Sequence, residues 1–223
     1  MSHSKRVVSV ALFAWIAVAT SASAGTIVLG GGWQASCDPS LDSFVDLHVD
    51  AVTADALYIE KSAEFTLPPG PGGFRPIAIQ FEQIASPAVS RIIIDDEILT
   101  NHTGSAWTDF HWDLLDEGEA TFDQTPPFFF STAPLNHQVF PNPSSFWVDG
   151  FGLGPGGSNA VVPNNSVWFP GGGTSDGQLV MNVVPHQVTP YTVFVLKETQ
   201  TPEPASALLM LAGLGLMRRR GGM

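Results

Sequence analysis

The sequence predicts an all-β domain, folded as an antiparallel β-sandwich or a jelly roll. Apolar and polar residues alternate along several short segments, which is the pattern of half-buried strands. The 22 Gly and 18 Pro residues interrupt these segments often, as turn residues do. Between the two apolar ends, no segment keeps a sustained 3.6-residue period, so we expect a body built from strands alone.

The predicted strands are separated by turns rich in Gly and Pro. Residues 57–67 alternate most clearly, and Lys61 is the residue there that places a charge on the apolar face. Further strands are predicted at 76–83, 89–98, 178–184 and 191–197. Turns or loops are predicted at 68–73, 150–157 and 171–173. This spacing of short strands is typical of two packed sheets.

The N-terminal end has the three parts of a secretory signal peptide. Lys5 and Arg6 form the positive region, residues 7–18 form the apolar region, and Ala22-Ser23-Ala24 fits the cleavage box before Gly25. The sequence therefore predicts a signal helix within residues 1–24 and export of the chain from the cytoplasm.

The C-terminal end combines a short motif, an apolar segment and a cluster of positive charge. Pro202-Glu203-Pro204 precedes the apolar residues 205–217, and Arg218-Arg219-Arg220 follows them. A helix of that length covers roughly 20 Å, whereas the hydrocarbon core of a bilayer is about 30 Å thick. Clustered arginines hold their end of such a segment in the cytoplasm. We expect a hydrophobic sorting helix that anchors the chain in the inner membrane only transiently.

This C-terminal arrangement resembles the PEP-CTERM sorting signal of Gram-negative bacteria. The resemblance implies that an exosortase, a membrane-embedded cysteine protease or transpeptidase, recognises the tail. The residues that carry it are Pro202, Glu203, Pro204, Arg218, Arg219 and Arg220. It also implies cleavage near the Pro-Glu-Pro motif and delivery to the cell surface or an exopolysaccharide matrix. The alternative is an ordinary C-terminal anchor that is never cut.

The chain is thus divided into a signal peptide at 1–24, an all-β secreted domain at 25–198 and a sorting signal at 199–223. Between the two ends it has four Lys and Arg residues and 20 Asp and Glu residues, a net charge of −16. Such a charge does not suit nucleic acid or an anionic membrane surface as a partner. Cys37 is the only Cys in the chain, so it is either buried or bridges two chains.

The densest group of polar and aromatic residues lies between residues 95 and 112. We expect a hairpin here, with its turn at 101–104. A metal-site hypothesis joins Asp95, Asp96, Glu97, Asp109 and His111. Carboxylate oxygens with one imidazole suit Ca²⁺ and, less well, Zn²⁺ or Mn²⁺. The simpler interpretation is a solvated strand end without a cofactor.

The tryptophans give a second binding hypothesis. Trp147 and Trp168 flank the Gly-rich segment 150–157 and could frame a groove in which their rings stack on sugars. The partner would then be an extracellular polysaccharide. The simpler interpretation places the tryptophans in the core of the sandwich.

The sequence contains neither a P-loop nor a His-Glu-x-x-His motif. We therefore expect an exported, non-catalytic protein of the cell surface or the extracellular matrix. One alternative is a carbohydrate-binding module. The other is a calcium-dependent or hydrolytic enzyme, because a glycosidase needs only two suitably spaced carboxyl groups.

Overall fold

The computed structural model describes residues 25–41, 44–70, 73–115, 118–125, 133–152, 159–171 and 178–202. Within these ranges the elements are β1 (Thr26–Gly30), β2 (Trp33–Cys37), η1 (Pro39–Leu41), β3 (Val45–Val52), β4 (Ala56–Phe65), β5 (Ile77–Gln83), β6 (Arg91–Asn101), β7 (Trp107–Leu115), β8 (Ala120–Phe122), β9 (His137–Asn142), β10 (Ser145–Asp149), β11 (Ser166–Trp168), β12 (Leu179–Val183) and β13 (Val193–Pro202). The all-β prediction is confirmed.

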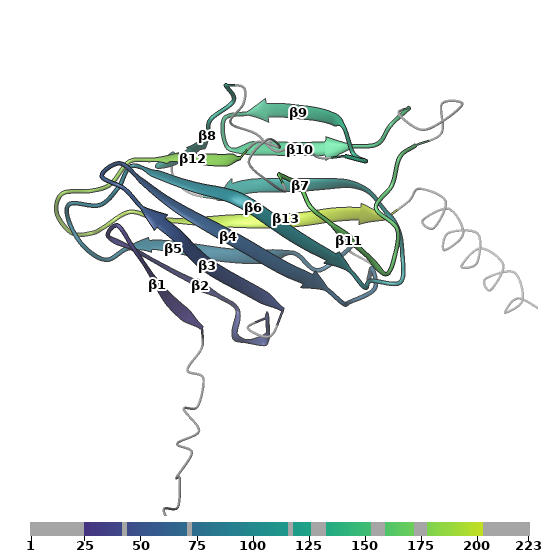
Figure 1. The fold of residues 1–223 in the computed structure, drawn as a ribbon, viewed down its shortest axis with the longest axis horizontal. Coiled ribbons are helices and arrows are strands. Elements are labelled where there is room, and N and C mark those ends of the chain that lie inside the picture. Colours follow the sequence, from purple (N-terminus) through teal and green to yellow (C-terminus); the bar gives the residue numbers. More distant parts are fainter. Residues whose placement is uncertain are drawn as a thin grey trace, which may run out of the picture.

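The strands form two sheets packed face to face, as in a β-sandwich. Sheet A has the order β1-β2-β5-β13-β7-β10-β9, and sheet B has the order β3-β4-β6-β12-β8, with β11 also paired to β6. In Figure 1, β3, β4 and β6 cross in front of β5, β13 and β7. Neighbouring strands are antiparallel except β4 and β6, which are parallel because β5, between them in sequence, belongs to the other sheet.

The predicted hairpin at residues 101–104 is wrong, because β6 lies in sheet B and β7 lies in sheet A. The segment between them is instead a corner that crosses from one sheet to the other. Asn101 is buried at this corner, where its amide donates to the carbonyl oxygens of Ser105, Val162 and Pro163. Gly104 supplies a φ of 82°, a conformation that favours glycine. A buried side chain thus replaces the hydrogen bonds of a hairpin turn.

The core between the sheets is rich in large aromatic side chains. The fully buried rings include Trp33, Trp107, Trp112, Phe110 and Phe146. Trp112 stacks on Phe146 with ring centroids 5.1 Å apart, and Phe110 lies 4.7 Å from Trp112. These rings pack together with the buried aliphatic residues of both sheets into one core.

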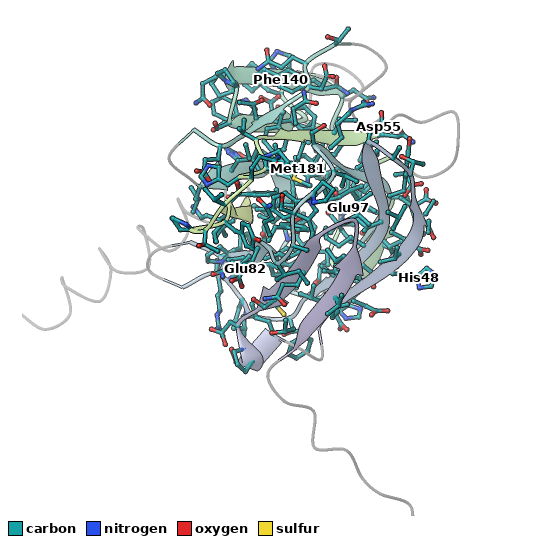
Figure 2. All side chains as sticks on the ribbon, turned by 90° about the vertical axis from the view of Figure 1, so that its left-hand side faces the viewer. His48, Asp55, Glu82, Glu97, Phe140 and Met181 are labelled. Atoms are coloured by element: carbon teal, nitrogen blue, oxygen red, sulfur yellow. The ribbon has the colours of Figure 1, made fainter. Side chains whose placement is uncertain are left out.

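A one-residue bulge in β6 decides which side chains enter the core. Ile94 pairs with Ile59 of β4, but the next pair is Glu60 with Asp96, so Asp95 has no partner in the ladder. The bulge reverses the alternation of β6. Glu97 therefore points inward, opposite Lys61 of β4, and Figure 2 shows it in the interior.

The ends of the chain were predicted as a signal helix and a sorting helix, and both lie outside the described residues. The last strand, β13, continues to Pro202 and so extends beyond the predicted domain boundary at residue 198. Among the described residues, no helix is long and apolar enough to cross a membrane. Cys37, at the end of β2, is half-buried.

We predict that deleting Asp95 preserves the fold, whereas deleting Ile98 does not. Loss of Asp95 removes the bulge and leaves Glu97 opposite Lys61, so stability should stay within about 1–2 kcal/mol of the parent. Loss of Ile98 turns Leu99 outward and should cost roughly 3 kcal/mol or more. Urea denaturation measures both, and equal losses would contradict the role given to the bulge.

Candidate functional site

The outer face of sheet A carries a group of aromatic and ionisable side chains on β7, β9 and β10. Phe110 and Trp112 of β7 point into the core, so Asp109 and His111, which alternate with them, point outward. Trp147 of β10 is the register partner of His111, and Asp149 is the partner of Asp109. His137 of β9 is in turn opposite Asp149.

We call Asp109, His111, His137, Trp147 and Asp149 the outer-face patch. It contains two imidazole–carboxylate pairs: His111 Nε2 is 3.4 Å from Asp109 Oδ2, and His137 Nδ1 is 3.0 Å from Asp149 Oδ1. The ring of Trp147 lies 5.1 Å from that of His111, tilted by 45°. An indole ring bordered by carboxylate acceptors suits a hydroxyl-rich ligand with an apolar face, such as a sugar.

The five residues of the metal-site hypothesis do not come together. Asp109 and His111 belong to the outer-face patch on sheet A, whereas Asp95 and Asp96 lie half-buried on β6 of sheet B. Glu97 lies in the core between the two sheets. The described residues include no group of three or more His, Cys, Asp or Glu side chains arranged to hold a metal ion.

Asp95 has a different neighbour from the one predicted. Burial, followed by the nearby carboxylate of Asp50 on β3, raises the pKa of Asp95 to about 6. Asp95 therefore faces an acidic residue of its own sheet rather than the predicted partners Asp109 and His111 on β7. The five residues lie apart because β6 and β7 belong to different sheets.

The two tryptophans of the carbohydrate hypothesis also separate. Trp147 belongs to the outer-face patch, but Trp168 is only 3% exposed and packs against Phe110 and Trp112. Its indole nitrogen donates to the carbonyl oxygen of Ala133 at 2.9 Å. Trp168 is therefore a core residue, and the two rings do not frame one groove.

Sequence reasoning did not find His137 and Asp149 as partners of this patch. The signal was the alternation in β10, where Ser145, Trp147 and Asp149 share the outer face. The register of β10 against β7 and β9 comes from the fold, and it cannot be read from local pattern alone.

Two sequence patterns associated with other chemistries lack their structural context. Residues 173–177 read Gly-Thr-Ser-Asp-Gly, which matches the Gly-x-Ser-x-Gly pattern of hydrolases. That motif needs a strand before the Ser and a helix after it, whereas strand β12 follows here. Residues 152–157 match Gly-x-Gly-x-x-Gly, but the described residues show no helix after them, as a dinucleotide site requires. Most residues of both patterns lie outside the described ranges.

A buried ionic cluster lies between the two sheets. Lys61 contacts Glu97 Oε1 through its Nζ, and the same Nζ donates to Glu198 Oε2 of β13 at 2.9 Å. Trp112 Nε1 donates to Glu97 Oε2 at 3.1 Å. Lys61, Glu97 and Glu198 are each 0% exposed, and we call them the core triad. The positive charge of Lys61, which interrupts the apolar face of β4, is therefore paired with carboxyl groups inside the core.

The core triad changes the protonation of its members. Burial by itself would lower the pKa of Lys61, but the carboxylates of Glu198 and Glu97 outweigh burial and raise it above its ordinary value. Burial raises the pKa of Glu97 to about 8, opposed by Lys61 and reinforced by Glu198. The directions of these two pKa shifts favour the ammonium form of Lys61 and the neutral form of Glu97.

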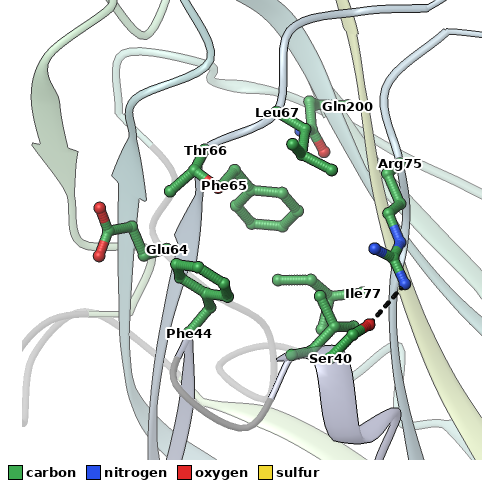
Figure 3. Close-up of a pocket in the computed structure, with 10 residues that line it drawn as sticks. Ser40, Phe44, Glu64, Phe65, Thr66, Leu67, Arg75, Ile77 and Gln200 are labelled. Carbon is green, nitrogen blue, oxygen red and sulfur yellow. Dashed lines mark hydrogen bonds between the residues drawn. The ribbon is translucent and has the colours of Figure 1, made fainter.

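A separate pocket of about 220 Å³ opens at one end of the sandwich. Its walls are mainly apolar, and in Figure 3 the rings of Phe44 and Phe65 face it together with Ile77. Gln200 of β13 lines it and is 3% exposed, and its Oε1 has no hydrogen-bond partner among the described residues. Arg75, at the rim, donates to Ser40 Oγ at 2.8 Å. The pocket suits an apolar group that carries one hydrogen-bond donor.

The predicted sorting residues fall at the edge of the described structure. Pro202 is the last residue of β13, opposite Trp107 of β7. The other five lie outside the described residues: Glu203, Pro204, Arg218, Arg219 and Arg220.

Comparison with family models identifies one match, a PEP-CTERM protein-sorting motif over residues 200–220. No curated protein and no solved structure matches the chain. The chain therefore carries a PEP-CTERM sorting motif, which supports export through an exosortase system of the Gram-negative type. The motif begins within β13, so the sandwich leads directly into the sorting tail.

We predict that replacing Lys61 with Met destabilises the protein by about 3–5 kcal/mol, because two carboxyl groups are then buried without a cation. Lys197→Met is the matched control, since Lys197 lies on the outer face of β13 next to Glu198. Its loss should change stability by less than about 1 kcal/mol. Urea denaturation compares the two, and similar losses would show that the core triad is not held together by Lys61.

Proposed function

We propose that the protein is an exported, non-catalytic component of the cell surface or extracellular matrix of a Gram-negative bacterium. The sorting motif at residues 200–220 is the observation that carries this proposal. In this account, the signal peptide starts export, and the apolar C-terminal segment holds the chain in the inner membrane for a time. An exosortase then cuts near the Pro-Glu-Pro motif.

The position of the motif supports release of an intact domain. Because β13 ends at Pro202, a cut after that residue leaves every described strand in place. The core triad supports a structural rather than a catalytic role for the buried charges, since its three side chains are 0% exposed and no external substrate reaches them.

A second candidate function is binding of an extracellular polysaccharide, and the outer-face patch favours it. Trp147 offers a partly exposed ring, and Asp109 and Asp149 place carboxylate oxygens beside it, with side chains 22% and 27% exposed. Sugar rings stack on indole faces and donate hydroxyl hydrogens to carboxylates. The ligand would be a neutral polysaccharide, since the strongly negative domain repels anionic ones.

For sorting, we predict that mature protein from cells with an active exosortase lacks the tail. Mass spectrometry of tryptic peptides is the measurement, because an uncut chain yields a peptide spanning residues 198–218. Replacing Glu203 and Pro204 with Ala should restore that peptide. The matched control replaces Gly221 and Gly222, beyond the arginines, and should be processed normally.

Recovery of peptide 198–218 in full amount from surface-exposed wild-type protein would contradict the sorting proposal. The tail would then act as a permanent anchor rather than as a signal that is removed.

For polysaccharide binding, we predict that Trp147→Ala abolishes retardation of the protein in affinity electrophoresis through neutral polysaccharide gels. Loss of one stacked indole should weaken binding roughly 10-fold or more. Phe169→Ala is the control, since Phe169 is a 55% exposed aromatic residue outside the outer-face patch. Absence of retardation for the wild type across the gels, or equal retardation of both variants, would refute the assignment.

A further inference from the structure

The core triad has the composition of a reaction site as well as that of an ion cluster. Lys61 is a nitrogen nucleophile, and Glu97 presents a carboxyl carbon whose Oε1 contacts Lys61 Nζ. Glu198 Oε2 accepts a hydrogen bond from the same Nζ at 2.9 Å. Trp112 Nε1 donates to Glu97 Oε2 at 3.1 Å, where negative charge would develop if the carbonyl carbon were attacked.

The backbone holds the two reacting groups in place. Lys61 and Glu97 are register partners on the parallel strands β4 and β6, and the bulge at Asp95 turns Glu97 toward Lys61. Glu198 and Trp112 are register partners on β13 and β7 of the opposite sheet. Each sheet therefore contributes two of the four groups, and the reaction would be intramolecular with a high effective concentration.

We propose that Lys61 and Glu97 become joined by an intramolecular amide bond between Lys61 Nζ and Glu97 Cδ, with Glu198 as the proton acceptor. This isopeptide bond would link β4 to β6 inside the core. The inference does not depend on the proposed function.

The reaction balances with one molecule of water as the only other product. Lys61 starts as an ammonium, Glu97 as a neutral carboxylic acid and Glu198 as a carboxylate. Glu198 takes a proton from Nζ, whose lone pair then attacks Cδ of Glu97 and forms the C–N bond. The C–O bond to the hydroxyl oxygen breaks, and that oxygen leaves as water after receiving a second proton from nitrogen by way of Glu198. Glu198 ends protonated, and no oxidant, reductant or cofactor is required.

The surroundings favour condensation over hydrolysis. The starting state buries an ammonium and a carboxylate, which is costly at 0% exposure, whereas the product state contains only neutral groups. Burial also raises the pKa of Glu97, which keeps its carboxyl group in the neutral form that an amine attacks. Exclusion of bulk water further limits the reverse reaction.

The isopeptide bond would also give the domain a covalent cross-link, which its single Cys cannot provide. The chain has a single Cys, Cys37, so it has no intramolecular disulfide to hold the domain together outside the cell. A cross-link between residues 61 and 97 closes a loop in the unfolded chain and would restrict it in the way a disulfide does.

Peptide mapping of the denatured full-length or mature protein tests the proposal. Trypsin cuts after Lys61 only if its ammonium is free, and it cuts after Arg91 and Lys197 but poorly after Arg75, which precedes Pro76. The cross-linked chain should lack peptide 62–91. It should yield a branched species that joins a peptide ending at Arg91 to peptide 92–197 and is one water molecule lighter than their sum.

Variants identify the groups responsible. Glu198→Gln removes the proton acceptor and should abolish the branched species. Lys61→Arg keeps the positive charge but should restore cleavage after residue 61. Glu60→Gln, a change next to Lys61 on the opposite face of β4, should leave the branched species in full amount.

Full recovery of peptide 62–91 from folded wild-type protein, without the branched species, would overturn the proposal and leave the core triad as an ion cluster. This comparison uses the wild-type chain alone, so it decides the question even if the Glu198 variant does not fold. A branched species that persists in Glu198→Gln would refute the role of Glu198.

Discussion

Burial of Lys61 with two carboxyl groups is the constraint on which the rest of the sandwich depends. A lone ammonium between two sheets would be prohibitively costly, so the fold must bring acceptors to it from both sides. Glu97 comes from the neighbouring strand of the same sheet, and Glu198 comes from β13 of the facing sheet. The two sheets are therefore held in one relative position at this level of the core. A shift of either sheet along its strands would separate the charged groups.

The bulge at Asp95 is the local feature that satisfies this constraint. Without it, the alternation set by Ile92 and Ile94 would place Asp96 inside and Glu97 outside. The same reversal brings Leu99 and Asn101 into the interior, where Asn101 organises the corner between β6 and β7. One unpaired residue thus links the core triad to the crossing between the sheets. The bulge leaves the Asp95 carboxyl group partly buried and close to Asp50, and both effects raise the pKa of Asp95.

Local patterns in the sequence located β4, β5, β6, β12 and β13 but not their partners, and they did not mark β1, β2, β3 or β8 to β11. The alternation in 57–67 identified β4, and its one exception, Lys61, marked the most constrained position of the core. The bulge was not predicted, because a regular alternation already places Ile92, Ile94 and Ile98 on one apolar face and Glu97 on the other. The predicted hairpin was wrong, and the residues of the metal-site hypothesis lie apart, because β6 and β7 belong to different sheets. Trp147 and Trp168 are similar in local context, and only the tertiary fold separates the exposed ring from the buried one.

The most direct test of this account is an experimental electron-density map of β4 and β6 at a resolution that defines side-chain positions. We expect Asp95 to bulge out of the ladder and the Glu97 side chain to lie in the core against Lys61 Nζ and Glu198. A map with a regular β6, Glu97 on the outer face and the Lys61 ammonium reaching solvent would contradict it.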